Sequence, residues 1–225
     1  MLRFTLTERA LHWGFAFGYL LLLVSGLPLM IPALRDVIRG YTPVVGLRLH
    51  LVGAALWVGL SLAIVAVGDR RRLRKTGRQL AGLSRDDAAW LLGFPRWLSS
   101  AHQRARLDRS VGRFNAGQRV NAVFTAGTSA LLLVTGLALC PVNVKGTTLG
   151  SLLTGPDSIE DWRHVHRWIT VLALGPLAGH IFLAGVHPST RPSLSGMVTG
   201  HVDAAWARSH YPRWSGEEGD DAPEP

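Results

Sequence analysis

Four histidines lie within or at the edge of long apolar stretches of this chain. They are His12, His50, His166 and His180, out of nine histidines in total. A neutral imidazole is a good metal ligand, and an ionisable side chain at membrane depth marks a candidate functional site. One such histidine is equally compatible with a hydrogen-bonded packing residue. The pattern that the four form together therefore decides what chemistry they indicate.

The last two of these histidines have the spacing of a shared helix face. His166 and His180 are fourteen residues apart, which is about 21 Å along a helix and about 40° short of four full turns. Their side chains are therefore expected to leave the helix on nearly the same side. His164 would lie about 160° away from His180 around the helix axis. The spacing predicts that His166, rather than His164, shares a face with His180.

These histidines lie in or next to stretches that are free of charged residues. Four such stretches occur, at 10–34, 49–68, 120–144 and 168–190, and charged residues make up only 17% of the chain. Each stretch reaches the roughly 20 residues that a helix needs to cross a bilayer. We expect an all-α membrane protein, a four-transmembrane-helix bundle with spans at about 10–34, 46–68, 118–140 and 163–186. This domain covers 1–214, and the acidic tail at 215–225 is expected to be disordered.

The positive charges predict the orientation of the bundle. The segment 69–119 between the second and third spans holds thirteen Lys and Arg residues, and the two termini raise the total on that side to eighteen. The other side has six, including Lys145. Cytoplasmic loops are enriched in Lys and Arg, so both termini and the loop 69–117 are expected on the cytoplasmic side of a bacterial inner membrane. Short interfacial helices are predicted within this loop, and no soluble domain exists to present a basic face to nucleic acid.

This orientation sorts the four histidines by depth. His12 and His180 fall at the cytoplasmic side of the bilayer, and His50 and His166 fall at the outer side. Two imidazoles from two helices, one pair in each leaflet, suit a planar cofactor held between them. Axial imidazoles are typical haem ligands. The sequence therefore predicts two haem b groups, an outer one on His50 and His166 and an inner one on His12 and His180.

Zinc is the main alternative metal. Zinc sites use three or four ligands drawn from Cys, His, Asp and Glu, but the predicted spans contain no acidic residue and Cys140 is the only cysteine. Gly26 and Gly53 would each offer a patch without a Cβ atom, on which a porphyrin could lie. Small residues also let helices pack closely without any cofactor, so the glycines alone do not distinguish the two cases.

Five segments of the sequence resemble one protein family. They are RALHW at 9–13, RLHLVG at 48–53, VGRFNAGQR at 111–119, SLSGMVTG at 193–200 and WARSHYPRW at 206–214. Together they resemble the gamma subunit, the membrane cytochrome b subunit, of formate dehydrogenase, over about 3–214. The histidine pattern is shared more loosely with the cytochrome b subunits of nickel–iron hydrogenases and with other bacterial di-haem cytochromes b.

The resemblance implies a quinone site as well as the four haem ligands. It implies a menaquinone or ubiquinone pocket on the cytoplasmic side, lined by Asn115, Gly117 and Gln118 with His180 close by. Amide donors next to a glycine suit the two carbonyl groups of a quinone. The alternative is purely structural, with Asn115 as the N-cap of the third span and Gln118 in its first turn.

The resemblance also implies the function and the partners. The chain would carry electrons from a periplasmic-side dehydrogenase, with its catalytic (alpha) and iron–sulfur (beta) subunits, through the haems to quinone. The sequence shows no nucleotide-binding glycine loop and no substrate-dehydrogenation site of its own. Two alternatives stay open at this point. One is a cytochrome b subunit of a hydrogenase or another molybdopterin oxidoreductase, and the other is a haem-free membrane anchor.

Overall fold

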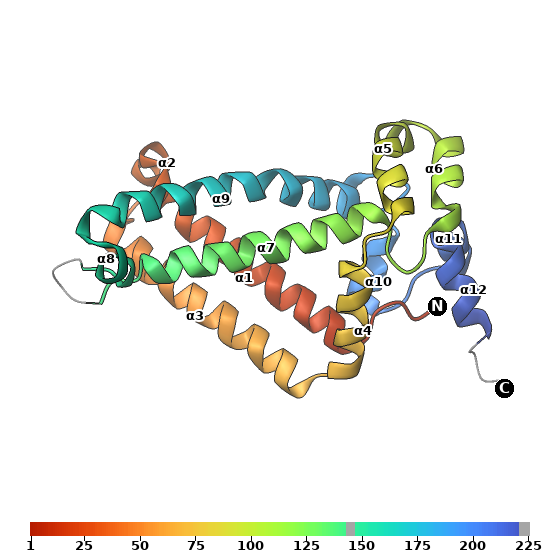
Figure 1. Ribbon diagram of the computed structural model, residues 1–225, viewed down its shortest axis with the longest axis horizontal. Helices are drawn as coiled ribbons and strands as arrows, with labels where there is room; N and C mark the ends of the chain where they lie inside the picture. The colour runs from red at the N-terminus through yellow and green to blue at the C-terminus, as the bar shows by residue number, and fades with distance from the viewer. Residues whose placement is uncertain (143–146, 221–225) are drawn as a thin grey trace. The chain divides into compact units, whose positions relative to one another are not determined.

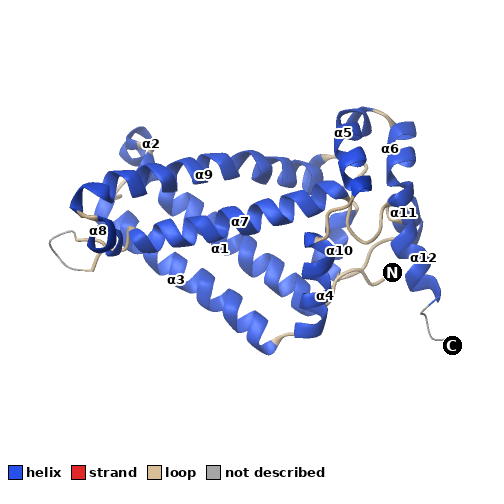
Figure 2. Cartoon of the chain, viewed as in Figure 1, coloured by secondary structure: helices blue, strands red, loops and turns tan. Residues whose placement is uncertain are grey.

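The computed structural model describes residues 1–142 and 147–220. Within these ranges the chain is helical and contains no strand (Figures 1 and 2), apart from two isolated bridges, Leu2 with His201 and Pro141 with Thr148. Lys145 and the last five residues of the predicted tail lie outside the described residues.

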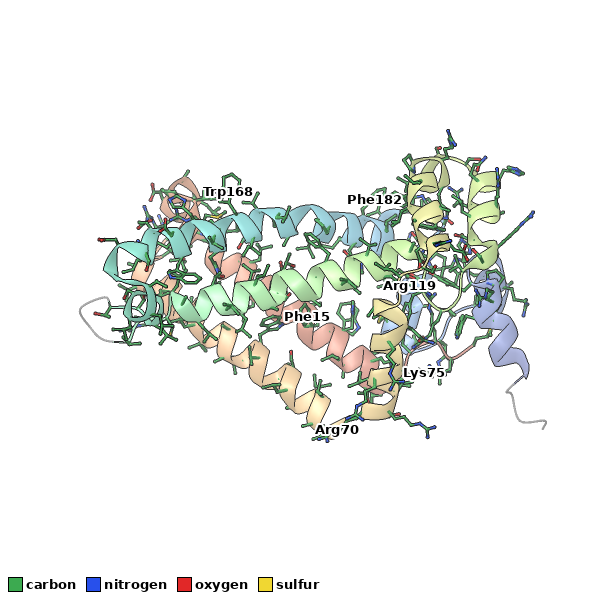
Figure 3. The ribbon with its side chains drawn as sticks, in the orientation of Figure 1. Phe15, Arg70, Lys75, Arg119, Trp168 and Phe182 are labelled. Carbon is green, nitrogen blue, oxygen red and sulfur yellow. The ribbon has the colours of Figure 1, made fainter. Side chains whose placement is uncertain are left out.

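Four helices in the described ranges are long and apolar enough to cross a membrane. They are α1 (Leu6–Met30), α3 (Pro43–Val67), α7 (Ala116–Ala138) and α9 (Ile159–Ile181), the last of which continues as the π-helical η3 (Phe182–Val186). Only 6–17% of the most apolar window of each is buried. Trp168 and Phe182 on the last span are examples of the large apolar side chains that these helices expose (Figure 3). Lipid must cover such apolar surfaces, and the predicted all-α fold with four spans is confirmed.

The first span is displaced towards the N-terminus relative to the charge-free stretch 10–34. α1 begins at Leu6 because Glu8, which is buried, forms an ion pair with Arg72 at 3.6 Å and is accommodated in the helix. It ends at Met30 because Ile31 precedes a proline and adopts an extended backbone. The short helix α2 (Pro32–Val37) follows.

The chain divides into two compact units, which we describe separately. Unit 1 comprises Met1–Thr5, Arg74–Ala130 and Leu172–Pro225, and unit 2 comprises Leu6–Leu73 and Leu131–Val171. The spanning helices α7 and α9 therefore contribute one part to each unit.

Unit 2 is built on the contact between α1 and α3 (Figure 1). The indole ring of Trp57 occupies the space that a Cβ atom would take at Gly18, and its Nε1 donates to the Phe15 carbonyl at 3.2 Å. A Cβ atom at Gly53 would lie 3.3 Å from Leu21 Cδ2. Gly53 therefore allows close packing of these two helices. The unit also contains the short helices α8 (Leu149–Thr154) and η2 (Pro156–Ser158).

The predicted cytoplasmic loop is mostly helical. It forms α4 (Arg70–Ala81), α5 (Arg85–Ser99), α6 (Ala101–Leu107) and η1 (Asp108–Ser110). A capping box between Ser84 and Asp87 begins α5, and α5 and α6 form a helical hairpin (Figure 1). Helices α10 (Ser193–Thr199), α11 (Ala204–His210) and α12 (Pro212–Asp220) complete unit 1. Helix α12 overlaps the first part of the tail 215–225, whose disorder stays a prediction.

A buried carboxylate organises the aromatic core of unit 1. Asp108 is only 3% exposed, and its Oδ1 accepts hydrogen bonds from Trp90 Nε1 at 3.1 Å and Trp97 Nε1 at 3.0 Å. Burial raises the pKa of the Asp108 carboxyl group, and the two indole hydrogen bonds oppose that shift. Tyr211 and Trp214 belong to the same core, so the C-terminal segment packs with α5.

His210 lies in the same unit, with both ring nitrogens in hydrogen bonds. Its Nε2 is 2.8 Å from Ser189 Oγ, and its Nδ1 is 3.0 Å from the Trp206 carbonyl oxygen. Burial lowers the pKa of His210, while the hydrogen bond to Trp206 and the charge of Asp108 act in the opposite direction. The fold therefore favours the neutral imidazole.

We expect this histidine to make unit 1 acid-labile. Because the pKa of His210 is lower in the folded state than its ordinary value of 6.5, the unfolded state binds the proton more tightly, and stability is lost as the pH falls below about 6.5. His210→Gln should reduce the fall in Tm between pH 7.5 and pH 5.5, by about 2–4 °C for each kcal/mol of this contribution. Thermal unfolding of both proteins in detergent measures the difference, and parallel Tm–pH curves would contradict the expectation.

Candidate functional site

His50 and His166 face each other in unit 2. His50 lies on α3 and His166 on α9, and their ring centroids are 6.4 Å apart with an angle of 82° between the ring planes. The two side chains are 116 positions apart in the sequence. The structure thus brings together the two histidines that were predicted to share the outer haem.

The separation of the two rings fits a shared metal ion. Two imidazoles that bind one metal from opposite sides, each at about 2.0 Å, have ring centroids about 6.3 Å apart. Within the described ranges, no group of three or more His, Cys, Asp or Glu side chains is placed to hold a metal. The two imidazoles would therefore suit a haem iron held by two histidines, and they fall short of a closed zinc site.

Two glycines lie directly against these imidazoles. A Cβ atom at Gly26 of α1 would be 3.0 Å from His50 Cε1, which is tighter than ordinary van der Waals contact, and one at Gly136 of α7 would be 3.6 Å from His166 Cε1. Gly26 thus leaves room for the His50 ring itself. The sequence indicated Gly26 as a patch without a Cβ atom, whereas nothing in the pattern singled out Gly136.

Two hydroxyl groups contact the imidazoles from the other two spanning helices. Ser25 Oγ on α1 is 3.1 Å from His50 Nδ1, and Thr135 Oγ1 on α7 is 2.7 Å from His166 Nδ1. Sequence reasoning missed both residues because Ser and Thr in apolar helices commonly bond their own backbone. With them, each of the four spanning helices contributes to this site.

The predicted inner ligands fall in different units. His12 belongs to α1 in unit 2, and His180 lies near the end of α9 in unit 1, so their pairing stays a prediction. His164 lies on α9 two residues before His166, and its side chain is exposed.

The residues predicted to bind quinone begin α7 with a capping box. Asn115 Oδ1 accepts from the Gln118 backbone N–H at 2.9 Å, and Gln118 Oε1 accepts from the Asn115 N–H at 3.0 Å. Asn115 and Gln118 therefore cap the start of α7, as the structural alternative expected. The cap leaves the side-chain NH₂ groups of both amides for other partners. Gln118 Nε2 donates to the Tyr211 hydroxyl at 3.3 Å.

A pocket of about 220 Å³ adjoins this helix start. Asn115 and Trp90 line it, together with Arg119, which Figure 3 labels. Arg119 forms an ion pair with Asp87 at 2.9 Å. Gly117 does not line this pocket, but a Cβ atom there would be 3.2 Å from Trp90 Cζ3. Only Asn115 of the four predicted quinone residues contributes to this cavity.

Tyr211 is a partner of this segment that the sequence did not single out. Its side chain is 2% exposed, and the guanidinium carbon of Arg3 lies 3.7 Å from its ring centroid. Tyr211 belongs to the segment WARSHYPRW, which carries part of the family resemblance. The resemblance did not assign a role to this residue. The structure links that segment to Gln118.

Four helices able to span a membrane, two of which carry imidazoles that lie close together, are typical of integral membrane proteins of the cytochrome b class. The chain belongs to the prokaryotic cytochrome b561 family, whose model matches residues 3–200. Such proteins carry haem b and transfer electrons.

Two relatives from Escherichia coli (strain K12) are similar over most of their length. The cytochrome b556(Fdn) subunit of nitrate-inducible formate dehydrogenase is 25% identical over 217 residues, which cover 92% of this chain and 86% of the relative. The cytochrome b556(fdo) subunit of formate dehydrogenase is 26% identical over 220 residues, which cover 95% and 91%.

Proposed function

We propose that this protein is the membrane cytochrome b subunit of a formate dehydrogenase-like complex and delivers electrons to quinone. The observation that carries the proposal is the pair of imidazoles, His50 and His166, at a ring separation of 6.4 Å. The names of the two relatives support the choice of partner, because both are cytochrome b556 subunits of formate dehydrogenases. The iron–sulfur and catalytic subunits of such an enzyme would be the electron donors.

Two haem b groups fit the four histidines of the spans. His50 and His166 would hold one haem, and His12 and His180 would hold the other. Haem iron supplies a one-electron couple between its ferric and ferrous states when bound. The chain itself supplies the imidazole ligands, the apolar surroundings and, at Gly26, the room for a ligand ring.

Charge asymmetry supports an orientation with both termini in the cytoplasm. Eighteen of the 24 Lys and Arg residues belong to the termini and to the segment 69–119, and such residues are retained on the cytoplasmic side. The start of α7 then lies on that side, where protons for quinone reduction are available. Electron transfer from the outer side to this side would move charge across the membrane without a proton channel.

The quinone site proposed here comprises Asn115, Gly117, Gln118 and His180. Quinone carbonyls accept hydrogen bonds, and the capping box uses the Asn115 and Gln118 oxygens while leaving their amide NH₂ groups as donors. Gln118 Nε2 donates one of its two hydrogens to the Tyr211 hydroxyl, so the second hydrogen remains for a ligand.

Gln118→Glu tests this site and keeps the helix cap. A glutamate at this position preserves the Oε1 acceptor of the capping box but removes the Nε2 donor. We expect the rate of reduction of a soluble quinone to fall about three- to tenfold, because this factor corresponds to the free energy of one hydrogen bond. Dithionite should still reduce the purified protein fully and produce the α-band of haem b at wild-type intensity.

The control is Gln103→Leu, on α6 of the same unit, which should change neither quinone reduction nor the haem spectrum. Wild-type quinone turnover in Gln118→Glu would remove Gln118 from the proposed site. A wild-type protein loaded with haem that shows no b-type α-band would overturn the electron-transfer function itself.

A further inference from the structure

Each imidazole of the His50–His166 pair has a hydroxyl partner on a neighbouring helix. Ser25 Oγ lies 3.1 Å from His50 Nδ1, and Thr135 Oγ1 lies 2.7 Å from His166 Nδ1. Both hydroxyl residues are buried, at 7% and 3% exposure. The arrangement occurs twice, on α1 and on α7, with the same ring nitrogen facing the hydroxyl each time.

The single hydrogen of each hydroxyl is directed to its own helix. Ser25 Oγ is 2.8 Å from the Leu21 carbonyl oxygen, and Thr135 Oγ1 is 2.8 Å from the Leu131 carbonyl oxygen. A carbonyl oxygen only accepts, so each hydroxyl donates there. The lone pair of each hydroxyl can then accept from the imidazole, provided that Nδ1 carries the ring hydrogen in both histidines. This tautomer leaves the Nε2 lone pair of both rings free.

We propose that Ser25 and Thr135 are positioning residues that hold His50 and His166 in the tautomer and orientation for binding haem iron through Nε2. The proposal rests on the proposed haem-ligand role of these two histidines. A backbone carbonyl fixes each hydroxyl, and the hydroxyl in turn fixes the ring, so the orientation of the ligands is set before any cofactor binds.

The same hydrogen bonds bear on the redox potential. Donation from Nδ1–H makes the imidazole a stronger electron donor at Nε2, and a stronger donor favours the ferric state of bound iron. Ser25 and Thr135 therefore lower the midpoint potential. Thr135 is expected to act more strongly because its contact with the ring is 2.7 Å rather than 3.1 Å.

The test replaces Thr135 with valine, which has nearly the same shape and lacks the hydroxyl. Haem content and the midpoint potential are measured on the purified protein by optical redox titration, on the haem component that His166→Ala removes. We expect a three- to tenfold lower ratio of ferric to ferrous haem at a fixed potential. The upper limit corresponds to an upward shift of about 59 mV. Ser25→Ala should give a smaller shift in the same direction.

Thr128→Val is the matched control. Thr128 lies one heptad earlier on α7, is 6% exposed, and bonds the Phe124 carbonyl at 2.9 Å in the same way. This control should leave the midpoint potential of that haem unchanged. Thr135→Ser, which keeps the hydroxyl, should restore both haem content and potential if valine reduces them.

The outcomes separate this proposal from the one on which it rests. If Thr135→Val and Thr128→Val have the same potential while His166→Ala loses haem, the histidine is a ligand and the positioning role of Thr135 is wrong. If Thr135→Val loses haem and Thr135→Ser does not, the positioning role is supported. Full haem content in both His50→Ala and His166→Ala would overturn the ligand assignment and the positioning role together.

Discussion

If the protein holds the two haem b groups proposed above, the variant His166→Ala is expected to lose one of them from the purified protein and to retain the other. His166 is one of two imidazoles whose rings lie 6.4 Å apart, and alanine leaves His50 as the only donor in that pair. One axial imidazole cannot hold a b-type haem as two do, since haem b has no covalent attachment and Cys140 is the only cysteine. Haem per protein, measured by pyridine haemochrome, should fall to about half.

His164→Ala is the matched control because it removes a histidine from the same helix, two residues away. Helix geometry places the His164 side chain about 160° from His180 around the helix axis, so haem content should stay at the wild-type value. His180→Ala should also lose one haem, and the double variant with His166→Ala should lose both. Haem loss in His164→Ala with full retention in His166→Ala would show that the shared helix face had been assigned to the wrong histidine.

Gly26→Leu, a substitution on α1, is expected to reduce haem content about as much as His166→Ala does. Even the first side-chain atom at position 26 would lie 3.0 Å from His50 Cε1, and the rest of a leucine has no room beside the ring. The ring must move away, which separates it from His166. Leucine forms helix better than glycine by nearly 1 kcal/mol, so α1 itself should remain folded. We expect at least a twofold loss of the haem that His166→Ala removes.

Gly59→Leu serves as the control for this variant. Gly59 lies on α3, the helix that carries His50. Apart from its chain neighbours and its own helix backbone, no atom of the described residues lies within 4 Å of the place where its Cβ atom would be. The added side chain should meet lipid and leave haem content unchanged. Circular dichroism would report the helix content of both variants. A wild-type haem spectrum and potential in Gly26→Leu would show that the His50 ring is free to move without losing its ligand role.

The amino-acid sequence by itself determined that the protein is an all-α membrane protein with four spans, and it predicted which helix face carries His166 and His180. Four charge-free stretches of at least 20 residues fix four spanning helices, because a helix in lipid must satisfy its own backbone and expose apolar side chains. The fourteen-residue spacing of His166 and His180 depends only on helix geometry. The capping box of Ser84 and Asp87 is local in the same way, since it acts within four residues.

Only the tertiary structure decided which polar groups meet across helices. Thr135 and His166 are 31 residues apart, Ser25 and His50 are 25 apart, and Gln118 and Tyr211 are 93 apart. Such contacts depend on how helices rotate and pack, which no local pattern specifies. The same reason explains why Gly53 faces Leu21 of α1, although its distance from His50 suited a porphyrin contact equally well. Local periodicity places a residue on a face, and packing determines what that face meets.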